Sequence, residues 1–224
     1  MISEKALVAR LPRKAAFGAG SPATRLTKTA FDIFVAACLL AIVSIPLLLI
    51  VLIIRLDGGP ALYAHKRIGA GGRTFKCLKF RTMVPDSERV LAEVLAKDSA
   101  MAAQWLATRK LTNDPRVTRV GRFLRNSSLD ELPQLINVLR LEMSLVGPRP
   151  IVESEIPLYG EGFTQYCAVR PGMTGLWQVS GRSDISYEKR VQLDTWYVDN
   201  WSFGHDMIVL LRTIPAVLGG EGAR

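Results

Sequence analysis

The chain has 224 residues, 49% of them hydrophobic and 22% charged, which is enough for one compact domain with an accessory segment. Its net charge of +9 implies an anionic partner, and charge alone leaves open nucleic acid, an acidic lipid surface and phosphorylated small molecules. The three cysteines lack CxxC spacing and the two histidines lack an HExxH arrangement, which argues against a disulfide framework and against a zinc or histidine-built metal centre. A reducing, cytosolic environment fits best, and any metal would depend on carboxylate and phosphate oxygens.

The N-terminal region divides into two predicted segments. Residues 1–28 are basic and rich in Ala, Gly and Pro, and we expect them to form a mobile arm. The run from Phe31 to Ile54 is apolar apart from Asp32 and Ser44, and as a helix it is long enough to cross a bilayer. We therefore predict a membrane helix over residues 29–56. Its late start, its length and the lack of a small-x-small site behind it argue against a cleaved signal peptide.

Two membrane arrangements remain open for this helix. Six Lys and Arg residues precede the apolar run and a similar number follow within thirty residues, whereas a spanning helix should carry its positive charge asymmetrically. Pro46 removes a backbone donor and kinks the helix, while Ser44 can bond a freed carbonyl. A re-entrant hairpin with both flanks in the cytoplasm satisfies both observations, but spanning helices also tolerate proline.

The elements beyond the membrane helix follow from local patterns. Residues 61–81 contain two partly alternating runs around a glycine cluster, which predicts a β-hairpin; the glycine spacing matches neither common phosphate loop, so a turn is favoured. Residues 86–110 have one apolar helical face, typical of a packed or interfacial helix. A further helix begins near Asp130, because Pro133 is tolerated only early in a helix. The tail, residues 187–218, combines helical periodicity with aromatic residues that suit either a headgroup-level belt or the core.

Adjacent carboxylates at the start of that helix are the strongest candidate site. The run Ser128-Leu-Asp130-Glu131 fits a capping box, in which Glu131 reaches back to the cap and Asp130 complements the helix dipole. The same placement holds an ionised carboxylate where incoming phosphates would also be drawn. A structural cap and an active site are therefore compatible at this position.

Basic and glycine-rich segments surround the carboxylates in the sequence. Arginine forks match phosphate oxygens, and the prolines on both sides of Arg149 restrict its backbone. A later loop, from Arg170 to Arg182, combines glycines with Trp177 and Gln178 and has the composition of a nucleotide-sugar loop, although an ordinary loop that packs Trp177 into the core fits equally well. The cationic candidates for phosphate binding are Lys79, Arg81, Arg125 and Arg149.

At these residues the sequence resembles the bacterial sugar transferase family, the monotopic polyprenyl-phosphate phosphoglycosyl transferases. Several multi-residue motifs in a fixed order are far more specific than any one of them, and the resemblance covers roughly residues 25–215. The short chain looks most like the small members that initiate exopolysaccharide synthesis with galactosyl or glucosyl 1-phosphate. The matching motifs are Pro46, Lys79-Phe-Arg-Thr-Met, Asp114-Pro-Arg-Val-Thr, Gly121-Arg-Phe-Leu-Arg125, Ser128-Leu-Asp-Glu-Leu-Pro-Gln-Leu, Leu145-Val-Gly-Pro-Arg-Pro150 and Arg170-Pro-Gly-Met-Thr-Gly-Leu-Trp-Gln178.

The resemblance implies a fold and a location. It implies a helix-rich, mixed α/β protein: one re-entrant membrane helix that breaks near Ser44 and Pro46, then a cytosolic catalytic domain, residues 57–224, with a small β-hairpin and interfacial amphipathic helices. Some members place the serine and proline adjacently, whereas Ile45 separates them here. The domain would lie on the cytoplasmic face of the bacterial inner membrane, against the cytoplasmic leaflet.

The resemblance also implies a two-step transfer with Mg²⁺. Asp130 would attack the sugar-linked phosphate of a UDP-hexose, expel UMP and pass the phosphosugar to undecaprenyl phosphate. Glu131 would assist as a metal ligand or as a base, so both carboxylates are candidate Mg²⁺ ligands together with substrate phosphates. Lys79, Arg81, Arg125 and Arg149 match phosphate-holding positions, and Arg170, Gln178 and Arg182 match the nucleotide-sugar side.

Two further classes remain as alternatives. A non-catalytic, membrane-anchored basic module that binds acidic lipid or nucleic acid would depend on lysines and arginines and tolerate loss of one carboxylate. An integral enzyme with a spanning helix would place the two helix flanks on opposite sides of the membrane. We favour the transferase, for which no nucleic-acid partner is expected. The sequence leaves open whether galactose or glucose is carried, and whether the protein is a dimer.

Overall fold

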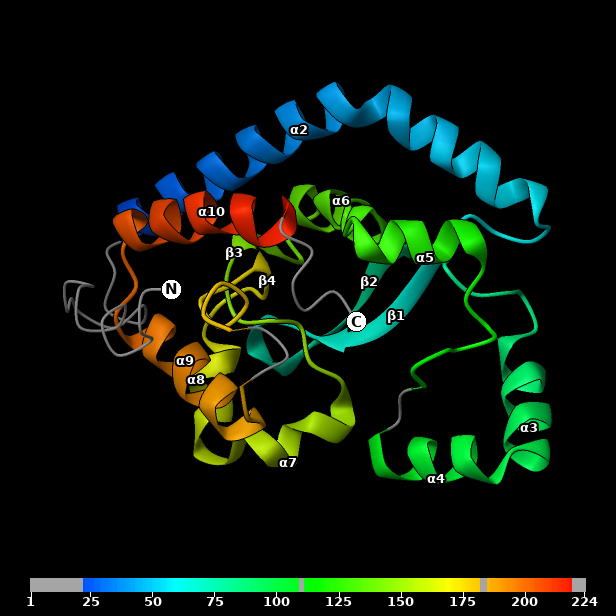
Figure 1. Ribbon diagram of the computed structural model, residues 1–224. Helices are drawn as coiled ribbons and strands as arrows, with labels where there is room; N and C mark the ends of the chain where they lie inside the picture. The colour runs from blue at the N-terminus through cyan, green and yellow to red at the C-terminus, as the bar shows by residue number, and fades with distance from the viewer. Residues whose placement is uncertain (1–21, 109–110, 182–184, 219–224) are drawn as a thin grey trace.

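The computed structural model describes residues 22–108, 111–181 and 185–218 and has the expected helix-rich α/β architecture. One long helix, α2 (Pro22–Leu56), lies along one side of the shorter elements (Figure 1). In chain order these are β1 (Leu62–Ile68), β2 (Thr74–Phe80), α3 (Ser87–Lys97), α4 (Ser99–Thr108), α5 (Arg119–Asn126), α6 (Gln134–Leu139), β3 (Ser144–Val146), α7 (Ile156–Tyr159), α8 (Phe163–Cys167), β4 (Gly172–Thr174), α9 (Tyr187–Asp199) and α10 (Phe203–Leu218).

Helix α2 is the predicted membrane segment. It is long and apolar enough to cross a bilayer, with a mean hydropathy of 3.2 in its most apolar window. It begins at Pro22, so the expected boundary between arm and helix at residue 28 falls inside it. Figure 1 shows α2 bent partway along its length, with both ends turned towards the rest of the protein. Pro46 lies within the helix, and the Ser44 hydroxyl donates to the Ala41 carbonyl at 2.8 Å.

The predicted β-hairpin is confirmed. Strands β1 and β2 pair antiparallel from Leu62 opposite Phe80 to Ile68 opposite Thr74. The glycine cluster makes the connecting turn, where Gly71 and Gly72 have φ values of 66° and 71° in the left-handed region that glycine adopts without strain. The turn interpretation of these glycines is therefore correct.

The single helix predicted over residues 86–110 is two helices, α3 and α4. The break falls at Asp98, whose backbone is extended and whose carboxylate accepts from the Ala100 and Met101 amides at 2.9 and 3.0 Å. The side chain of aspartate accepts hydrogen bonds from nearby backbone amides, so aspartate is more favourable at a helix N-cap than in a helix interior. The two helices pack on each other and extend away from α2 (Figure 1), and no side chain of α3 is buried. Residues 109–110 lie outside the described residues.

The C-terminal helices build the main core. The tail aromatics Tyr197 and Trp201 are buried there, as the core alternative predicted, whereas Phe203 is 41% exposed and meets Phe31 of α2 edge-on at 5.0 Å. Strands β3 and β4 run parallel beside them. Their neighbouring backbones approach so closely that a Cβ on Gly172 would lie 2.1 Å from a backbone nitrogen of Gly147, so only glycine fits.

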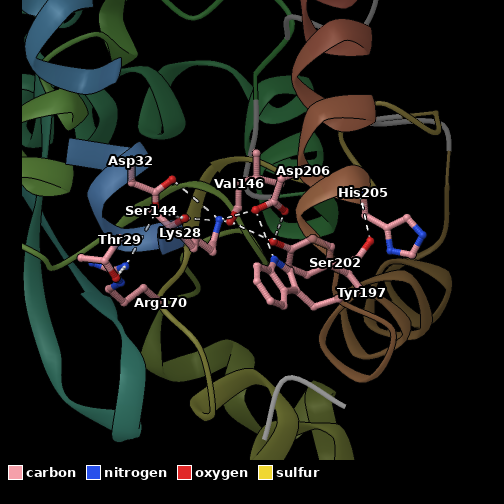
Figure 2. Close-up of polar contacts among 11 residues, drawn as sticks. Lys28, Thr29, Asp32, Ser144, Val146, Arg170, Tyr197, Ser202, His205 and Asp206 are labelled. Carbon is pink, nitrogen blue, oxygen red and sulfur yellow. Dashed lines mark hydrogen bonds and ion pairs between the residues drawn. The ribbon is translucent and has the colours of Figure 1, made fainter. Parts of the chain in front are cut away.

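A buried polar network attaches the first turns of α2 to this core (Figure 2). The Lys28 ammonium pairs with Asp206 of α10 at 2.6 Å, and both side chains are nearly inaccessible to solvent. Asp206 also accepts from the Tyr197 hydroxyl at 2.7 Å and from the Trp201 indole at 3.2 Å. Burial raises the pKa of Asp206, while Lys28 and the two hydrogen bonds oppose that rise.

One helical turn further along α2, Asp32 makes the second half of the network. It accepts from the Ser144 hydroxyl of β3 at 2.7 Å and lies 3.7 Å from the Arg170 guanidinium. Arg170 also donates to the Thr29 hydroxyl at 2.8 Å. Lys28 and Asp32, the two charged residues buried in the first turns of α2, therefore fix how this helix packs on the core.

We expect Lys28→Met to destabilise the protein by about 3 kcal/mol, because Asp206 would keep a buried charge without its cation. The measurement is chemical unfolding of the detergent-solubilised chain. Lys66→Met, at an exposed position of β1, is the matched control and should change stability by less than about 0.5 kcal/mol. Equal unfolding midpoints for Lys28→Met and the control would contradict this role.

Candidate active site

The two carboxylates lie on a short 3-10 helix, η3 (Leu129–Glu131), which precedes α6. The predicted capping box does not form: Ser128 has φ 56°, in the left-handed region, and its hydroxyl makes no capping hydrogen bond. Pro133 takes the N-cap position of α6 instead. The predicted helix therefore starts later than expected, and Glu131 is free to bind elsewhere.

Glu131 binds the hairpin. Its carboxylate accepts from the Lys79 ammonium of β2 at 2.6 Å, and the same ammonium lies 3.9 Å from Asp130. Asp130 is only 9% exposed. The structure thus brings together three predicted site residues, two carboxylates and one cation, at the junction of β2 and η3.

The two adjacent carboxyl groups differ in acidity. Burial raises the pKa of Asp130, and the neighbouring Glu131 charge adds to this, while Lys79 and Arg125 oppose it. Burial also acts to raise the pKa of Glu131, but Lys79, Arg149 and Arg67 together hold it below its ordinary value. Glu131 is therefore the permanent anion of the pair, and Asp130 is the less well solvated group with the greater affinity for a proton or an electrophile.

Two of the predicted arginines lie near this pair. Arg125 is carried by α5, which Thr118 caps by accepting from the Gly121 amide at 2.8 Å, and its Nε donates to the Thr82 hydroxyl at 2.9 Å. Arg149 follows β3 and is near enough to lower the pKa of Glu131. Both arginines thus contribute positive potential where a phosphate would meet Asp130.

The guanidinium of Arg81 is committed elsewhere. It donates to the carbonyls of Ile54, Gly58, Pro60 and Met83, which closes the C-terminal end of α2. These contacts satisfy carbonyls that a helix end leaves unpaired. The structure therefore gives Arg81 an anchoring position rather than the phosphate position expected from its motif.

Two of the three residues predicted for the nucleotide-sugar loop, Arg170 and Gln178, lie within the described residues. Arg170 belongs to the α2 network described above, and Arg182 lies outside the described residues. Gln178 donates to the Met173 carbonyl at 3.1 Å, while its side-chain oxygen is buried with no hydrogen-bond partner among the described residues. The Arg149 guanidinium lies 5.8 Å from the centre of the Trp177 ring, which places the indole beside one of the cations predicted to bind phosphate.

Three residues of the site were not predicted: Arg67, Arg190 and Asp194. Arg67 donates to the Pro150 carbonyl at 3.0 Å, and its charge helps hold Glu131 ionised. Strand alternation offers a signal for Arg67, because it shares a hairpin face with Lys79. Arg190 and Asp194 of α9 carry no such signal, since a charged pair four residues apart on a helix usually marks a solvated face.

The described residues contain no cluster of three or more His, Cys, Asp and Glu side chains suited to a metal. Asp130 and Glu131 supply carboxylate oxygens, and one Glu131 oxygen is already bonded to Lys79. Mg²⁺ commonly takes one or two carboxylates and completes its shell with water and substrate phosphates. The residues present therefore fit an ion held largely by the substrate.

Comparisons with known proteins assign the chain to a family. The model of the bacterial sugar transferase family matches residues 23–220, and the chain belongs to that family. It is 50% identical over 200 residues to the UDP-galactose-lipid carrier transferase of Erwinia amylovora, covering 89% of this chain and 42% of that protein. It is also 50% identical over 207 residues, 92% of each chain, to the exopolysaccharide production protein ExoY of Sinorhizobium fredii.

A third relative carries a fuller name. The chain is 40% identical over 210 residues to the UDP-glucose:undecaprenyl-phosphate glucose-1-phosphate transferase of Caulobacter vibrioides, covering 90% of this chain and 73% of that protein. The family resemblance of the sequence motifs is thereby confirmed. The chain spans about two fifths of the length of the Erwinia relative, so the match there is to one part of a longer protein.

We expect Asp130→Asn to raise the free energy of unfolding by about 1 kcal/mol at pH 7 to 8, because it replaces a carboxylate whose ionisation burial disfavours. The stability linked to a raised pKa is complete below the unfolded value of 3.8 and is lost as pH rises through the folded value. The gain should therefore shrink as pH falls towards 4. Denaturation at several pH values measures it.

The control for this prediction is Glu161→Gln, an equally isosteric change at an exposed position. It should leave stability unchanged across the same pH range. A loss of stability in Asp130→Asn at pH 7 to 8 would mean that the Asp130 carboxylate is stabilised by its surroundings, contrary to this account.

Proposed function

We propose that this protein transfers a hexose 1-phosphate, galactose or glucose, from a UDP-hexose to undecaprenyl phosphate and releases UMP. The relatives named above supply the reaction class and both hexoses. The observation that carries the proposal is the buried Asp130 carboxylate held beside Lys79 and Glu131, with Arg125 and Arg149 near it. The reaction would be the first membrane step of exopolysaccharide synthesis, as the ExoY relative suggests.

The proposed chemistry has two steps. An Asp130 oxygen forms a bond to the sugar-linked phosphorus, and the bond from that phosphorus to the bridging oxygen breaks, so that UMP leaves with the electron pair. An oxygen of undecaprenyl phosphate then attacks the same phosphorus, and the Asp130 carboxylate leaves. A partly desolvated carboxylate suits the first step, because it is more nucleophilic than one fully solvated by water.

The neighbouring groups divide the remaining work. Lys79 and Arg149 offset the phosphate charge, and Lys79 also fixes Glu131, which holds Asp130 in place through the backbone of η3. Bound Mg²⁺, held by the carboxylates and substrate phosphates, would further neutralise charge on the diphosphate. Glu131 has one oxygen engaged by Lys79 and so can serve the acceptor phosphate or the metal with the other.

The membrane arrangement is part of the proposal. A bent α2 with positive residues on both flanks, Pro46 within it and both ends turned towards the catalytic elements supports a re-entrant helix (Figure 1). We place the catalytic elements on the cytoplasmic face of the bacterial inner membrane, where UDP-hexose and the phosphate end of the polyprenol meet.

The activity prediction concerns Asp130→Asn. Membranes that carry the full chain, supplied with labelled UDP-hexose and undecaprenyl phosphate, should release UMP and label lipid. The variant should lose at least about 10³-fold in both rates, because an amide is a far weaker nucleophile toward phosphorus. Glu161→Gln is the matched control and should retain full activity. Full UMP release by Asp130→Asn would overturn the assignment of Asp130 as the nucleophile, whereas wild-type membranes that neither release UMP nor label lipid would favour the non-catalytic basic module.

The topology prediction uses single cysteines at Leu26, before the apolar run of α2, and at Asp57, after the end of α2, in a chain whose three cysteines are replaced by serine. A membrane-impermeant thiol reagent applied from the cytoplasmic side should label both positions. Protection of one position from the cytoplasmic side, with labelling from the opposite side, would establish a spanning helix instead.

A further inference from the structure

The guanidinium of Arg190 is buried with part of its hydrogen-bonding capacity unused. The side chain belongs to α9 and is 9% exposed. Its Nη1 reaches a Glu155 oxygen at 3.4 Å, but its Nε is 3.9 Å from Asp194, too far for a hydrogen bond. Among the described residues, Nε and Nη2 have no hydrogen-bond partner. Leaving charged donors buried and unpaired costs free energy, so such groups call for a ligand.

Two aromatic rings fix the orientation of these donors. The Arg190 guanidinium lies 5.0 Å from the ring of Trp177 and 4.9 Å from the ring of Tyr187. Cation–π contacts of this kind hold the planar guanidinium in one orientation, so that the side chain loses little further entropy when a ligand binds. The indole Nε1 of Trp177 is also buried and has no partner among the described residues. Three buried donors without a partner among the described residues thus belong to two side chains that contact each other.

The chemistry of these donors selects a phosphate. Nε and Nη2 lie on one edge of a guanidinium and present two parallel N–H groups, which is the fork that binds two oxygens of one phosphate. Neither neighbouring carboxyl group fills this role. Glu155 reaches Nη1 at 3.4 Å and not the other edge, and Asp194, 3.9 Å from Nε, accepts from the Tyr159 hydroxyl at 2.7 Å and has a pKa that burial raises to about 7. The positive charge of Arg190 is therefore only partly balanced by the protein.

The position of Arg190 relative to Asp130 indicates which phosphate it meets. Arg190 and Arg149 both lie beside the Trp177 ring, at 5.0 and 5.8 Å from its centre, and Arg149 in turn acts on Glu131 beside Asp130. Arg190 is not among the main charges that act on either carboxyl group, so it belongs to the same cation cluster as Arg149 but lies less close to the carboxyl pair. In a diphosphate, the phosphate next to the transferred one belongs to the nucleotide.

We propose that Arg190, with Nε and Nη2, and Trp177, with its indole N–H, bind the phosphate of the UMP portion of the nucleotide sugar. The proposal rests on the proposed function. When the bond to the transferred phosphorus breaks, negative charge develops on this leaving phosphate, and a fixed, partly unbalanced guanidinium stabilises it there. Arg190 then determines both nucleotide affinity and the ease with which UMP departs.

The test is calorimetric binding of UMP and of uridine to the full chain in detergent or nanodiscs. Arg190→Gln should weaken UMP binding about tenfold or more and leave uridine binding within about twofold of wild type, because only UMP carries the phosphate. Arg190→Lys, which keeps the charge but not the fork, should fall between. Trp177→Phe keeps a ring and removes one unpaired donor, and it should weaken UMP binding about fivefold.

Matched controls make each outcome informative. Arg89→Gln removes an exposed arginine of α3 and should bind both ligands as wild type does. If Arg190→Gln does not fold, Arg190→Lys and Trp177→Phe carry the test. UMP binding that is unchanged in both variants would overturn this inference. So would an equal loss of UMP and uridine affinity in a variant, or a loss of hexose 1-phosphate affinity while UMP affinity stays unchanged. Wild-type protein that neither binds UMP nor releases it would instead overturn the proposed function.

Discussion

The ion pair between Lys79 and Glu131 is the contact on which the rest of the site depends. It joins β2 of the hairpin to η3 at 2.6 Å and favours the ionised form of Glu131. Because Asp130 is the neighbouring residue of η3, the same contact keeps Asp130 in a poorly solvated position close to cations. Neighbouring carboxylates in one site separate in acidity when their surroundings differ. Here burial raises the pKa of Asp130 while the close contact with Lys79 holds that of Glu131 below its ordinary value.

The membrane helix is tied to the same structure at both ends. Near its start, Lys28 and Asp32 bind α10 and β3; at its end, the Arg81 guanidinium binds the terminal carbonyls. Burying an unpaired charge costs free energy, so these contacts specify one packing arrangement for a helix that is otherwise mainly apolar. A helix held in this way keeps a fixed position relative to β3, α10 and the end of β2.

Much of the fold and of the candidate site could be predicted from the sequence, because neighbouring residues largely determine local structure such as turns and strands. The hairpin followed from alternation and glycines, and Asp130, Glu131 and Lys79 from motifs in fixed order. The capping box was wrong because Lys79, distant in sequence, competes for Glu131 and Ser128 adopts a left-handed turn. Arg81 and Arg170 show the same limit: the sequence of a motif does not tell whether its arginine contacts a backbone carbonyl, a side chain or a ligand, because tertiary contacts decide this.

The central claim is that Asp130 becomes covalently attached to the transferred phosphosugar. The most direct measurement incubates the full chain with a UDP-hexose labelled in its sugar-linked phosphate, without polyprenol acceptor, followed by rapid quenching and mass analysis of peptides. The account predicts a hexose phosphate adduct on the peptide that contains Asp130, absent in Asp130→Asn and discharged by added undecaprenyl phosphate. Lipid labelling at full rate by wild-type protein, with no adduct at any quenching time and continued transfer by Asp130→Asn, would contradict it.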